Sequence, residues 1–175
     1  MTEAAAASSK GGPSIWVDAD ACPGLLRDVL FRAAERTRTP LTMVANKALR
    51  TPASQFIRAF QVARGFDAAD DEIVAALAPG DLVVTNDIPL AAQAIARGAR
   101  VLDMRGSWVD DNTIGDRLAT RDLLAELRDL GQARGGPAPL SQADRQAFAN
   151  RLDQFLTAAR RGTRAYEGRA VDKAF

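Results

Sequence analysis

The stretch that decides the fold is SIWVDADACPGLLRDVLFRAAERTR, residues 14–38. Its first five residues form a short run of β-favouring residues that ends at the acid Asp18. Such a run predicts a strand. After the turn at Pro23, apolar residues recur with the spacing of one helix face: Leu26, Val29, Leu30, Ala33 and Ala34. Proline is favoured near the first position of a helix. The stretch therefore predicts a strand, a tight turn and a helix.

Three further strands are predicted at residues 40–45 (PLTMVA), 81–85 (DLVVT) and 100–102. Short helices are predicted between them, at residues 69–78 and 90–97. Residues 55–62 (QFIRAFQV) fit either a helical turn or a strand, and their β-rich composition favours the strand. Strands that alternate with short helices predict an α/β fold with a mostly parallel sheet.

The last third of the chain has helical periodicity at about 113–130 and 141–160, on either side of a Gly-Gly-Pro linker. We therefore expect one domain over residues 14–160, a three-layer sandwich with added C-terminal helices. Residues 1–13 and 161–175 lack periodicity and are expected to be disordered tails. The spacing of Ser141 and Asp144 predicts a helix N-cap and its N3 partner.

The composition excludes several kinds of chemistry. The chain has 175 residues, with 23 Lys and Arg against 22 Asp and Glu, no histidine and one cysteine. Without histidine there is no Ser-His-Asp or Cys-His triad and no His-ligated zinc. A single thiol, Cys22, forms no disulfide within the chain, which favours the cytoplasm. No apolar run approaches the length of a membrane span, so no membrane partner is expected.

Charge is strongly segregated along the sequence. Residues 27–64 hold eight bases and two acids, whereas residues 67–87 hold six acids and no base. This pattern is expected where a metal-binding carboxylate cluster meets a polyanion. The alternative for residues 27–38 is that their arginines line the solvated face of a helix.

Acidic side chains follow two of the predicted strands and begin a helix: Asp18 and Asp20, Asp87 after Asn86, and Asp70 with Asp71. Because the carboxyl ends of parallel strands share one edge of a sheet, these carboxylates are expected to lie together. Their oxygens select Mg²⁺ or Mn²⁺ over zinc.

Each of these acids also has a purely structural interpretation. Asp18 and Asp20 fit a turn, and Asp70 and Asp71 fit a helix cap. Asp81 is expected to be a turn residue away from the site, and Asp103 is a possible outer acid.

Five motifs, in this order, carry a resemblance to a known family: WVDADACP at 16–23, VANKALR at 44–50, GFDAADDEIV at 65–74, GDLVVTNDIPLA at 80–91, and GGP with LSQADRQAF within 135–148. Over about residues 15–156 the chain resembles the YaiI/YqxD family of uncharacterised bacterial proteins. That resemblance implies a PIN-like fold, the nuclease fold in which acids at strand ends bind Mg²⁺ or Mn²⁺ and cleave RNA or structured nucleic acid.

The resemblance also implies roles for individual residues. Asp18, Asp70 or Asp71, and Asp87 match the metal-binding acids, while Asp20 belongs to the family's own DADACP motif. Further positions are implied in substrate binding: Asn46, Lys47, Arg50 and Thr85. Thr85 is expected to bond a carboxylate or a phosphate.

Three functions remain open from the sequence. The leading hypothesis is a metal-dependent phosphodiesterase that acts on RNA or another nucleic acid, with Asp18, Asp20, Asp70 and Asp87 as catalytic residues. The second is a non-catalytic RNA-binding or protein-interaction module. The third is an aspartyl-phosphate phosphotransferase with Asp18 as the nucleophile. Cys22 is not favoured as a nucleophile, because the chain has no histidine to act as its base.

Overall fold

The computed structural model describes residues 11–63, 65 and 67–171, with residues 163–171 described as backbone only. The elements follow in this order: β1 (Ile15–Asp18), α1 (Gly24–Thr37), β2 (Leu41–Ala45), β3 (Ile57–Gln61), α2 (Ala68–Ala76), β4 (Leu82–Val84), α3 (Ile88–Ala96), β5 (Arg100–Leu102), β6 (Trp108–Val109), α4 (Asp111–Asp129) and α5 (Gln142–Val171).

The sheet has six strands in the order β3-β2-β1-β4-β5-β6. The first five are parallel, and β6 pairs with β5 in the antiparallel sense. Ile15 lies opposite Leu41 on one side and Leu82 on the other. The predicted α/β fold with a mostly parallel sheet is thus confirmed, including the strand expected near residues 55–62.

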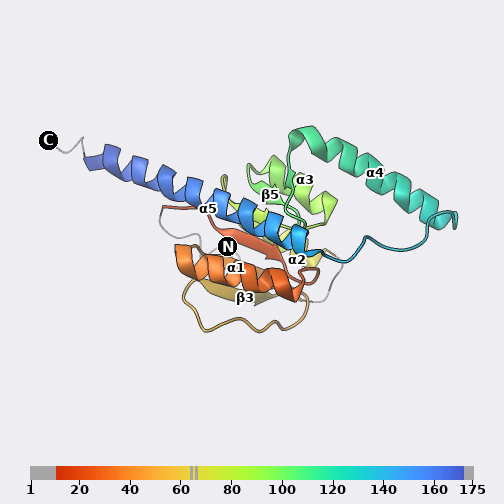
Figure 1. The fold of residues 1–175 in the computed structure, drawn as a ribbon, viewed down its shortest axis with the longest axis horizontal. Coiled ribbons are helices and arrows are strands. Elements are labelled where there is room, and N and C mark those ends of the chain that lie inside the picture. The colour runs from red at the N-terminus through yellow and green to blue at the C-terminus, as the bar shows by residue number, and fades with distance from the viewer. Residues whose placement is uncertain (1–10, 64, 66, 172–175) are drawn as a thin grey trace.

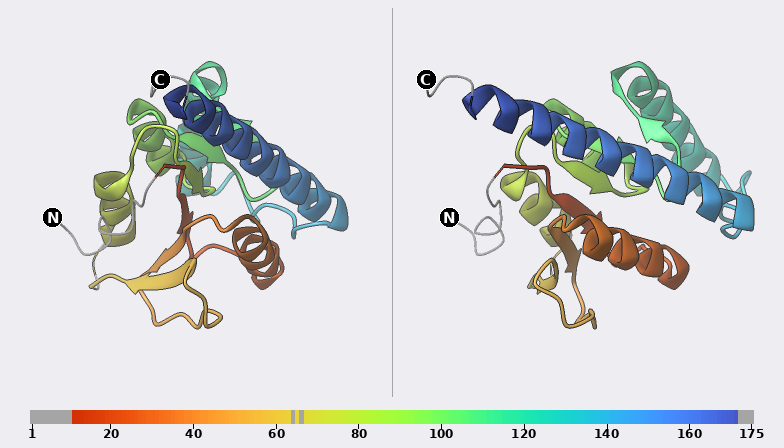
Figure 2. Two further views of the ribbon diagram at one scale, coloured as in Figure 1. Left: turned by 90° about the vertical axis from the view of Figure 1, so that its left-hand side faces the viewer. Right: turned by 60° about the vertical axis from the view of Figure 1, so that its left-hand side comes forward.

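Side chains alternate between the two faces of the sheet, because successive residues of a strand point to opposite sides. Ile15 and Val17 join the core under α1 and α5, whereas Trp16 joins the core under α2 and α3. The helices therefore cover both faces in three layers (Figure 1 and Figure 2). The edge at which β1, β2, β3, β4 and β5 end is the carboxyl edge.

The C-terminal helix is longer than its periodicity predicted. α5 begins at Gln142 and continues past residue 160 to Val171. Its start has the expected reciprocal bonds: Asp144 N donates to Ser141 Oγ at 3.0 Å, and Ser141 N donates to Asp144 Oδ2 at 2.9 Å. Of the predicted tails, residues 1–10 and 172–175 lie outside the described residues.

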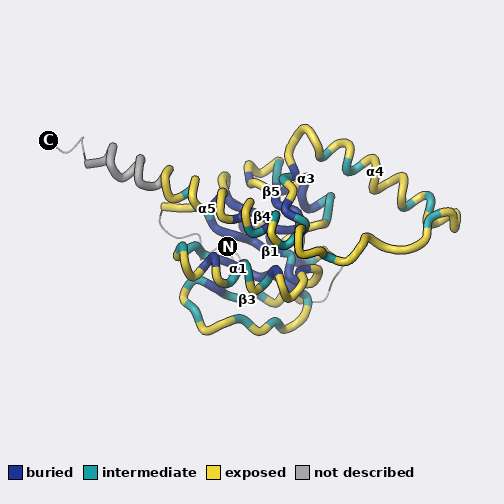
Figure 3. The backbone as a smooth tube through the Cα atoms, viewed as in Figure 1, coloured by how far each residue is buried: buried dark blue, intermediate teal, exposed yellow. Residues whose placement is uncertain are grey.

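α4 differs from the other helices in its surroundings. It packs beside α3 at its start, yet none of its residues is buried. Its far half projects away from the body of the molecule and is coloured as exposed along most of its length in Figure 3. Within the described residues, no helix is long and apolar enough to cross a membrane.

Asp81 does more than the predicted turn residue would. Asp81 is 3% exposed and directly precedes β4, at the end of that strand away from the carboxyl edge. It accepts hydrogen bonds from Ser14 N at 2.9 Å, Trp16 Nε1 at 3.0 Å and Ala78 N at 3.0 Å. Asp81 therefore ties the entry to β1 to the turn before β4.

We expect Asp81→Ala to lower the free energy of unfolding by about 3 kcal/mol, because the change leaves three N–H donors without their acceptor. Urea unfolding measures this loss. The control is Asp153→Ala, which removes an exposed ion pair with Arg36 and should cost under about 1 kcal/mol. Equal losses in the two variants would contradict the structural role of Asp81.

Candidate functional site

The candidate site lies where β1 and β4 end side by side. After β1 the chain leads to α1 on one face of the sheet, and after β4 it leads to α3 on the opposite face. The two connections therefore diverge and leave the carboxyl edge uncovered between them. Ligands bind at such switch points in open parallel sheets. Alternation along the strands places Asp18 and Thr85 on the side of α2 and α3.

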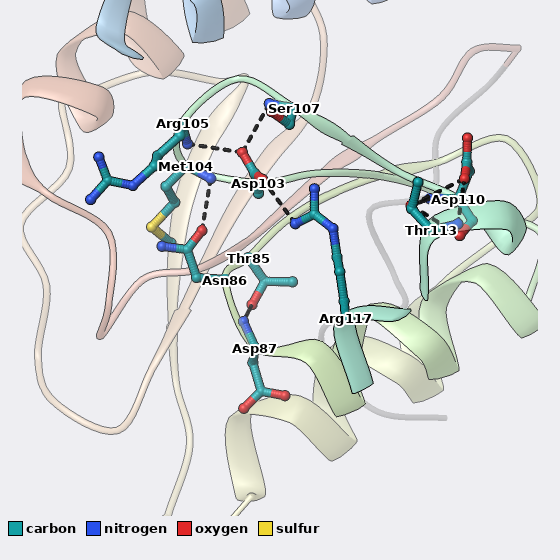
Figure 4. A network of polar contacts seen from close by, with 10 residues as sticks. All are labelled: Thr85, Asn86, Asp87, Asp103, Met104, Arg105, Ser107, Asp110, Thr113 and Arg117. Carbon is teal, nitrogen blue, oxygen red and sulfur yellow. Dashed lines mark hydrogen bonds and ion pairs between the residues drawn. The ribbon is translucent and has the colours of Figure 1, made fainter. Parts of the chain in front are cut away.

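Thr85 joins the ends of the two strands. Its hydroxyl donates to Asp18 Oδ2 at 3.2 Å and accepts from Asp87 N at 2.9 Å, the second of which is drawn in Figure 4. Thr85 is almost fully buried, so its hydroxyl holds these two acidic residues in place. The expectation that Thr85 bonds a carboxylate is confirmed.

Asp70 approaches the same edge from α2, which lies beside β1 and α3. Burial, and after it the charges of Asp87 and Asp18, raise the pKa of Asp70 to about 6. Burial also raises the pKa of Asp18, against the hydrogen bond from Thr85, and Asp87 and Asp20 add to the rise. Asp18, Asp70 and Asp87, the acidic group, therefore act on one another electrostatically.

The acids that begin α2 and α3 are not the ones that the sequence predicted as helix caps. Asp70 and Asp71 lie inside α2, whose N-cap is Asp67 in the left-handed region without a side-chain cap bond. Asp87 instead caps α3, since its Oδ1 accepts from Leu90 N at 2.8 Å. The expected capping role of Asp70 and Asp71 was wrong. An acid two residues before Pro89 was the signal that could have revealed the true cap.

Asp71 is exposed and occupies the helical position next to Asp70, about 100° further around α2. It raises the pKa of Asp70 least of the four neighbouring acids that do so. Of the two predicted alternatives, Asp70 is therefore the one that the structure brings to Asp18 and Asp87.

Asp20 and Asn46 meet beside Asp18. Asn46 N donates to Asp20 Oδ2 at 2.7 Å, which ties the end of β2 to the turn after β1. Asn46 Oδ1 is buried and has no hydrogen-bond partner among the described residues. Lys47 and Arg50 are exposed on the loop that leaves the carboxyl edge after β2. Their predicted contact with phosphate stays a prediction.

The arginines of α1 have structural contacts. Arg27 donates from Nε to Cys22 O at 3.0 Å and from Nη2 to Ala19 O at 3.1 Å, and so holds the turn that carries Asp20. Arg36 is exposed and pairs with Asp153 of α5. The interpretation of residues 27–38 as the outer face of a helix fits these contacts.

Asp103 belongs to a different arrangement, shown in Figure 4. Its carboxylate accepts from Arg105 N at 3.0 Å and Ser107 N at 2.9 Å, and it pairs with Arg117 of α4 at 3.0 Å. Nearby, Asn86 Oδ1 accepts from Met104 N at 2.9 Å. Asp103 and Asn86 therefore shape the turn between β5 and β6, and Asp103 already has a cationic partner.

Cys22 is buried, and burial raises the pKa of its thiol to about 11. The thiol stays protonated at neutral pH, so it is a poor nucleophile.

The acidic group has the charge and the donor atoms that a hard cation needs. None of the ion pairs between described residues includes Asp18, Asp70 or Asp87, so no basic side chain of the described part of the chain pairs with them. In the same part of the chain, no three His, Cys, Asp or Glu side chains are arranged to hold an ion by themselves. Mg²⁺ commonly uses one or two carboxylates and completes its shell with water and phosphate oxygens, so the residues fit Mg²⁺ in this manner.

We expect Asp70→Asn to raise the free energy of unfolding at pH 7 by about 1 kcal/mol, a value discounted for solvent screening. Because the pKa of Asp70 rises on folding, the native state binds more protons between about pH 4 and 6, and stability falls as pH rises through this range. The gain is therefore fully present above about pH 6 and disappears towards pH 4.

Urea unfolding in EDTA at pH 7 and pH 5 measures this pH dependence. The matched control is Asp71→Asn, which removes an exposed neighbouring charge and should give a smaller gain. A variant Asp70→Asn that is less stable than wild type at pH 7 would show that Asp70 stabilises the fold.

Comparison with known proteins gives the family. Residues 16–158 match the family model described as "Uncharacterized BCR, YaiI/YqxD family". A UPF0178 protein of Alkalilimnicola ehrlichii is 58% identical over 147 residues, which cover 84% of this chain and 99% of that protein. UPF0178 proteins of Bordetella petrii and Cronobacter sakazakii are each 57% identical over 84% of this chain, covering 98% and 97% of their own lengths.

No solved structure matches this chain. The family model covers the sheet except Ile15, the helices except the end of α5, and every residue of the acidic group. The relatives match over nearly their whole lengths. This chain belongs to the YaiI/YqxD family.

Proposed function

We propose that the protein is a metal-dependent phosphodiesterase that cleaves RNA or another nucleic acid at the carboxyl edge. The observation that carries this proposal is the acidic group, whose three carboxylates come from β1, α2 and the start of α3. The charge of Asp87 raises the pKa of both Asp18 and Asp70, in addition to the effect of burial. A fold gains nothing in stability from such repulsion, so a cation that binds there explains it. The resemblance to PIN-like nucleases supports the same conclusion.

In this proposal one or two carboxylates of the acidic group hold Mg²⁺ or Mn²⁺, and water and phosphate oxygens complete the shell of the ion. The ion, when bound, polarises a phosphodiester and lowers the pKa of water. Thr85 keeps Asp18 and Asp87 oriented through its two hydrogen bonds. Asp20 is exposed beside Asp18, which supports the proposal that it contacts the substrate.

Substrate binding in this proposal uses the residues after β2. Asn46 presents a buried side-chain oxygen that lacks a hydrogen-bond partner among the described residues, and Lys47 and Arg50 present exposed positive charges. These charges suit the phosphates that flank the cleaved bond. We place the activity in the cytoplasm. A protein with one free, buried cysteine forms no internal disulfide, as is usual in that reducing compartment.

A protein-interaction module is the second candidate function. The observation that favours it is the exposed leucines of α4, which are unusual on a chain that acts alone. The two functions are compatible, since α4 and the acidic group are separate features.

The test is incubation of wild type with labelled RNA and single-stranded DNA pools in Mn²⁺, Mg²⁺ or EDTA. The proposal expects cleavage that needs the metal and is lost when EDTA is added. Binding of RNA without cleavage under every metal condition would instead support the non-catalytic module.

A further inference from the structure

Only one end of the side-chain amide of Asn86 is used within the fold. Asn86 lies two residues past the end of β4, at the carboxyl edge, and it is exposed. Its Oδ1 accepts a hydrogen bond from Met104 N at 2.9 Å, as Figure 4 shows. Its Nδ2 donates to no residue in the described part of the chain. Asn86 therefore has two N–H groups for a ligand.

The bond to Met104 fixes which end of this amide is left for a ligand. A backbone N–H needs an acceptor, and within the amide of asparagine only the oxygen accepts. If the amide turned over, Nδ2 would face the N–H of Met104 and the bond would be lost. Asn86 therefore presents a donor at the carboxyl edge.

The turn that holds this amide is itself firmly held. Asp103 pairs with Arg117 of α4 at 3.0 Å, and Met104 is almost fully buried. Gly106 lies so close to α5 that an added Cβ would meet the backbone of that helix. The amide of Asn86 is thus oriented before any ligand arrives, which reduces the conformational entropy lost on binding.

The neighbours of Asn86 at the carboxyl edge offer mainly oxygen acceptors. β1 lies between β2 and β4, so Asp18 at the end of β1 lies between Asn46, which follows β2, and Asn86. Asp87 is the next residue along the chain, and Asn46 Oδ1 lacks a partner among the described residues. Asn86 is therefore a neutral donor beside the acidic group.

We propose that Asn86 Nδ2 donates a hydrogen bond to a phosphate oxygen of a nucleic acid, next to the phosphate that lies at the acidic group. The unesterified oxygens of a phosphodiester only accept hydrogen bonds, so they suit a group that only donates. A basic side chain at this position would instead pair with the neighbouring carboxylates. This inference rests on the proposed function and adds a substrate-binding residue to it.

The position of Asn86 gives the substrate a direction. Lys47 and Arg50 follow β2, whereas Asn86 follows β4 on the other side of Asp18. A strand that contacts both sides runs across the ends of β2, β1 and β4, with the acidic group between its contacts. Contacts with phosphate position a nucleic acid without reading its sequence, so RNA and single-stranded DNA should both use Asn86.

Asn86→Asp separates this contact from the structural role of the side chain. A carboxylate oxygen still accepts from Met104 N, so the unfolding midpoint in urea should stay unchanged. The variant has no donor, and we expect it to bind RNA and single-stranded DNA at least about tenfold more weakly than wild type. Fluorescence anisotropy of labelled oligonucleotides measures this in Ca²⁺, which takes oxygen ligands as Mg²⁺ does, at one salt concentration.

The matched control is Ala21→Asp. It adds the same charge at an exposed position of the turn after β1 and leaves the amide of Asn86 in place. Because solvent screens an exposed charge, binding should weaken only about twofold. Equal losses in the two variants would attribute the effect to charge alone and would overturn the contact.

Cleavage of the same oligonucleotides in Mn²⁺ separates this inference from the proposed activity. Wild type that binds without cutting, while Asn86→Asp binds more weakly, would keep the contact and reject the phosphodiesterase. Wild type that cuts, with the same KM in Asn86→Asp, would reject the contact and keep the activity. Wild type that binds neither oligonucleotide would overturn the contact and the nucleic-acid substrate together.

Discussion

Replacement of Gly106 by alanine is expected to lower the free energy of unfolding by about 3 to 5 kcal/mol or to prevent folding. Gly106 has a φ of +83°, and an added Cβ would lie 2.4 Å from Phe148 N and 2.5 Å from the carbonyl carbon of Ala147. Both atoms belong to the backbone of α5. That backbone cannot yield, because Phe148 is fully buried and Arg105 pairs with Asp144 on the same helix.

The control separates the close approach from the backbone conformation. Gly80 has a φ of +90°, and an added Cβ would meet nothing within 4 Å. Gly80→Ala should therefore cost only the strain of the left-handed region, about 1 to 2 kcal/mol. Urea unfolding of both variants measures the difference, and equal losses would mean that α5 does not pack on the turn before β6 as described.

Asp18→Asn is expected to reduce metal-dependent cleavage by at least about a hundredfold while the fold is retained. The amide oxygen of asparagine can still accept the hydrogen bond from Thr85, and a neutral side chain removes repulsion with Asp87. Lost activity would therefore reflect lost charge at the site. Initial rates on the best substrate of the labelled pool measure it.

Asp28→Asn is the matched control for this loss, because it removes an exposed carboxylate of α1 outside the acidic group. It should cleave like wild type. Full activity in Asp18→Asn would exclude a catalytic role for Asp18.

Local patterns predicted most of the fold. The continuous apolar run of β1 comes from burial of both faces of the sheet, and the helical spacing in α1 comes from burial of one face of the helix, so the sequence records both directly. β6 escaped notice because two residues, Trp108 and Val109, are too few to show a period. Its strand is defined by pairing with β5, a contact that no local pattern encodes.

The site was predictable only in part. Strand ends identified Asp18 and Asp87, because parallel strands bring their carboxyl ends to one edge. The hydrogen bond between Thr85 and Asp18 joins residues 67 positions apart, and the pairing of Arg117 with Asp103 depends on how α4 packs. Long-range contacts of this kind decide which acids have a basic partner and which have none. They can be seen only in the folded structure.

The most direct test of the central claim is calorimetric titration with Mn²⁺ of wild type and of the variant with Asp18→Asn and Asp87→Asn. Asparagine caps a helix as well as aspartate does, so the second change preserves the start of α3. The account predicts saturable binding to wild type at millimolar Mn²⁺ or below and none to the variant. Equal binding to both proteins, or no binding to wild type, would contradict a metal site at the acidic group.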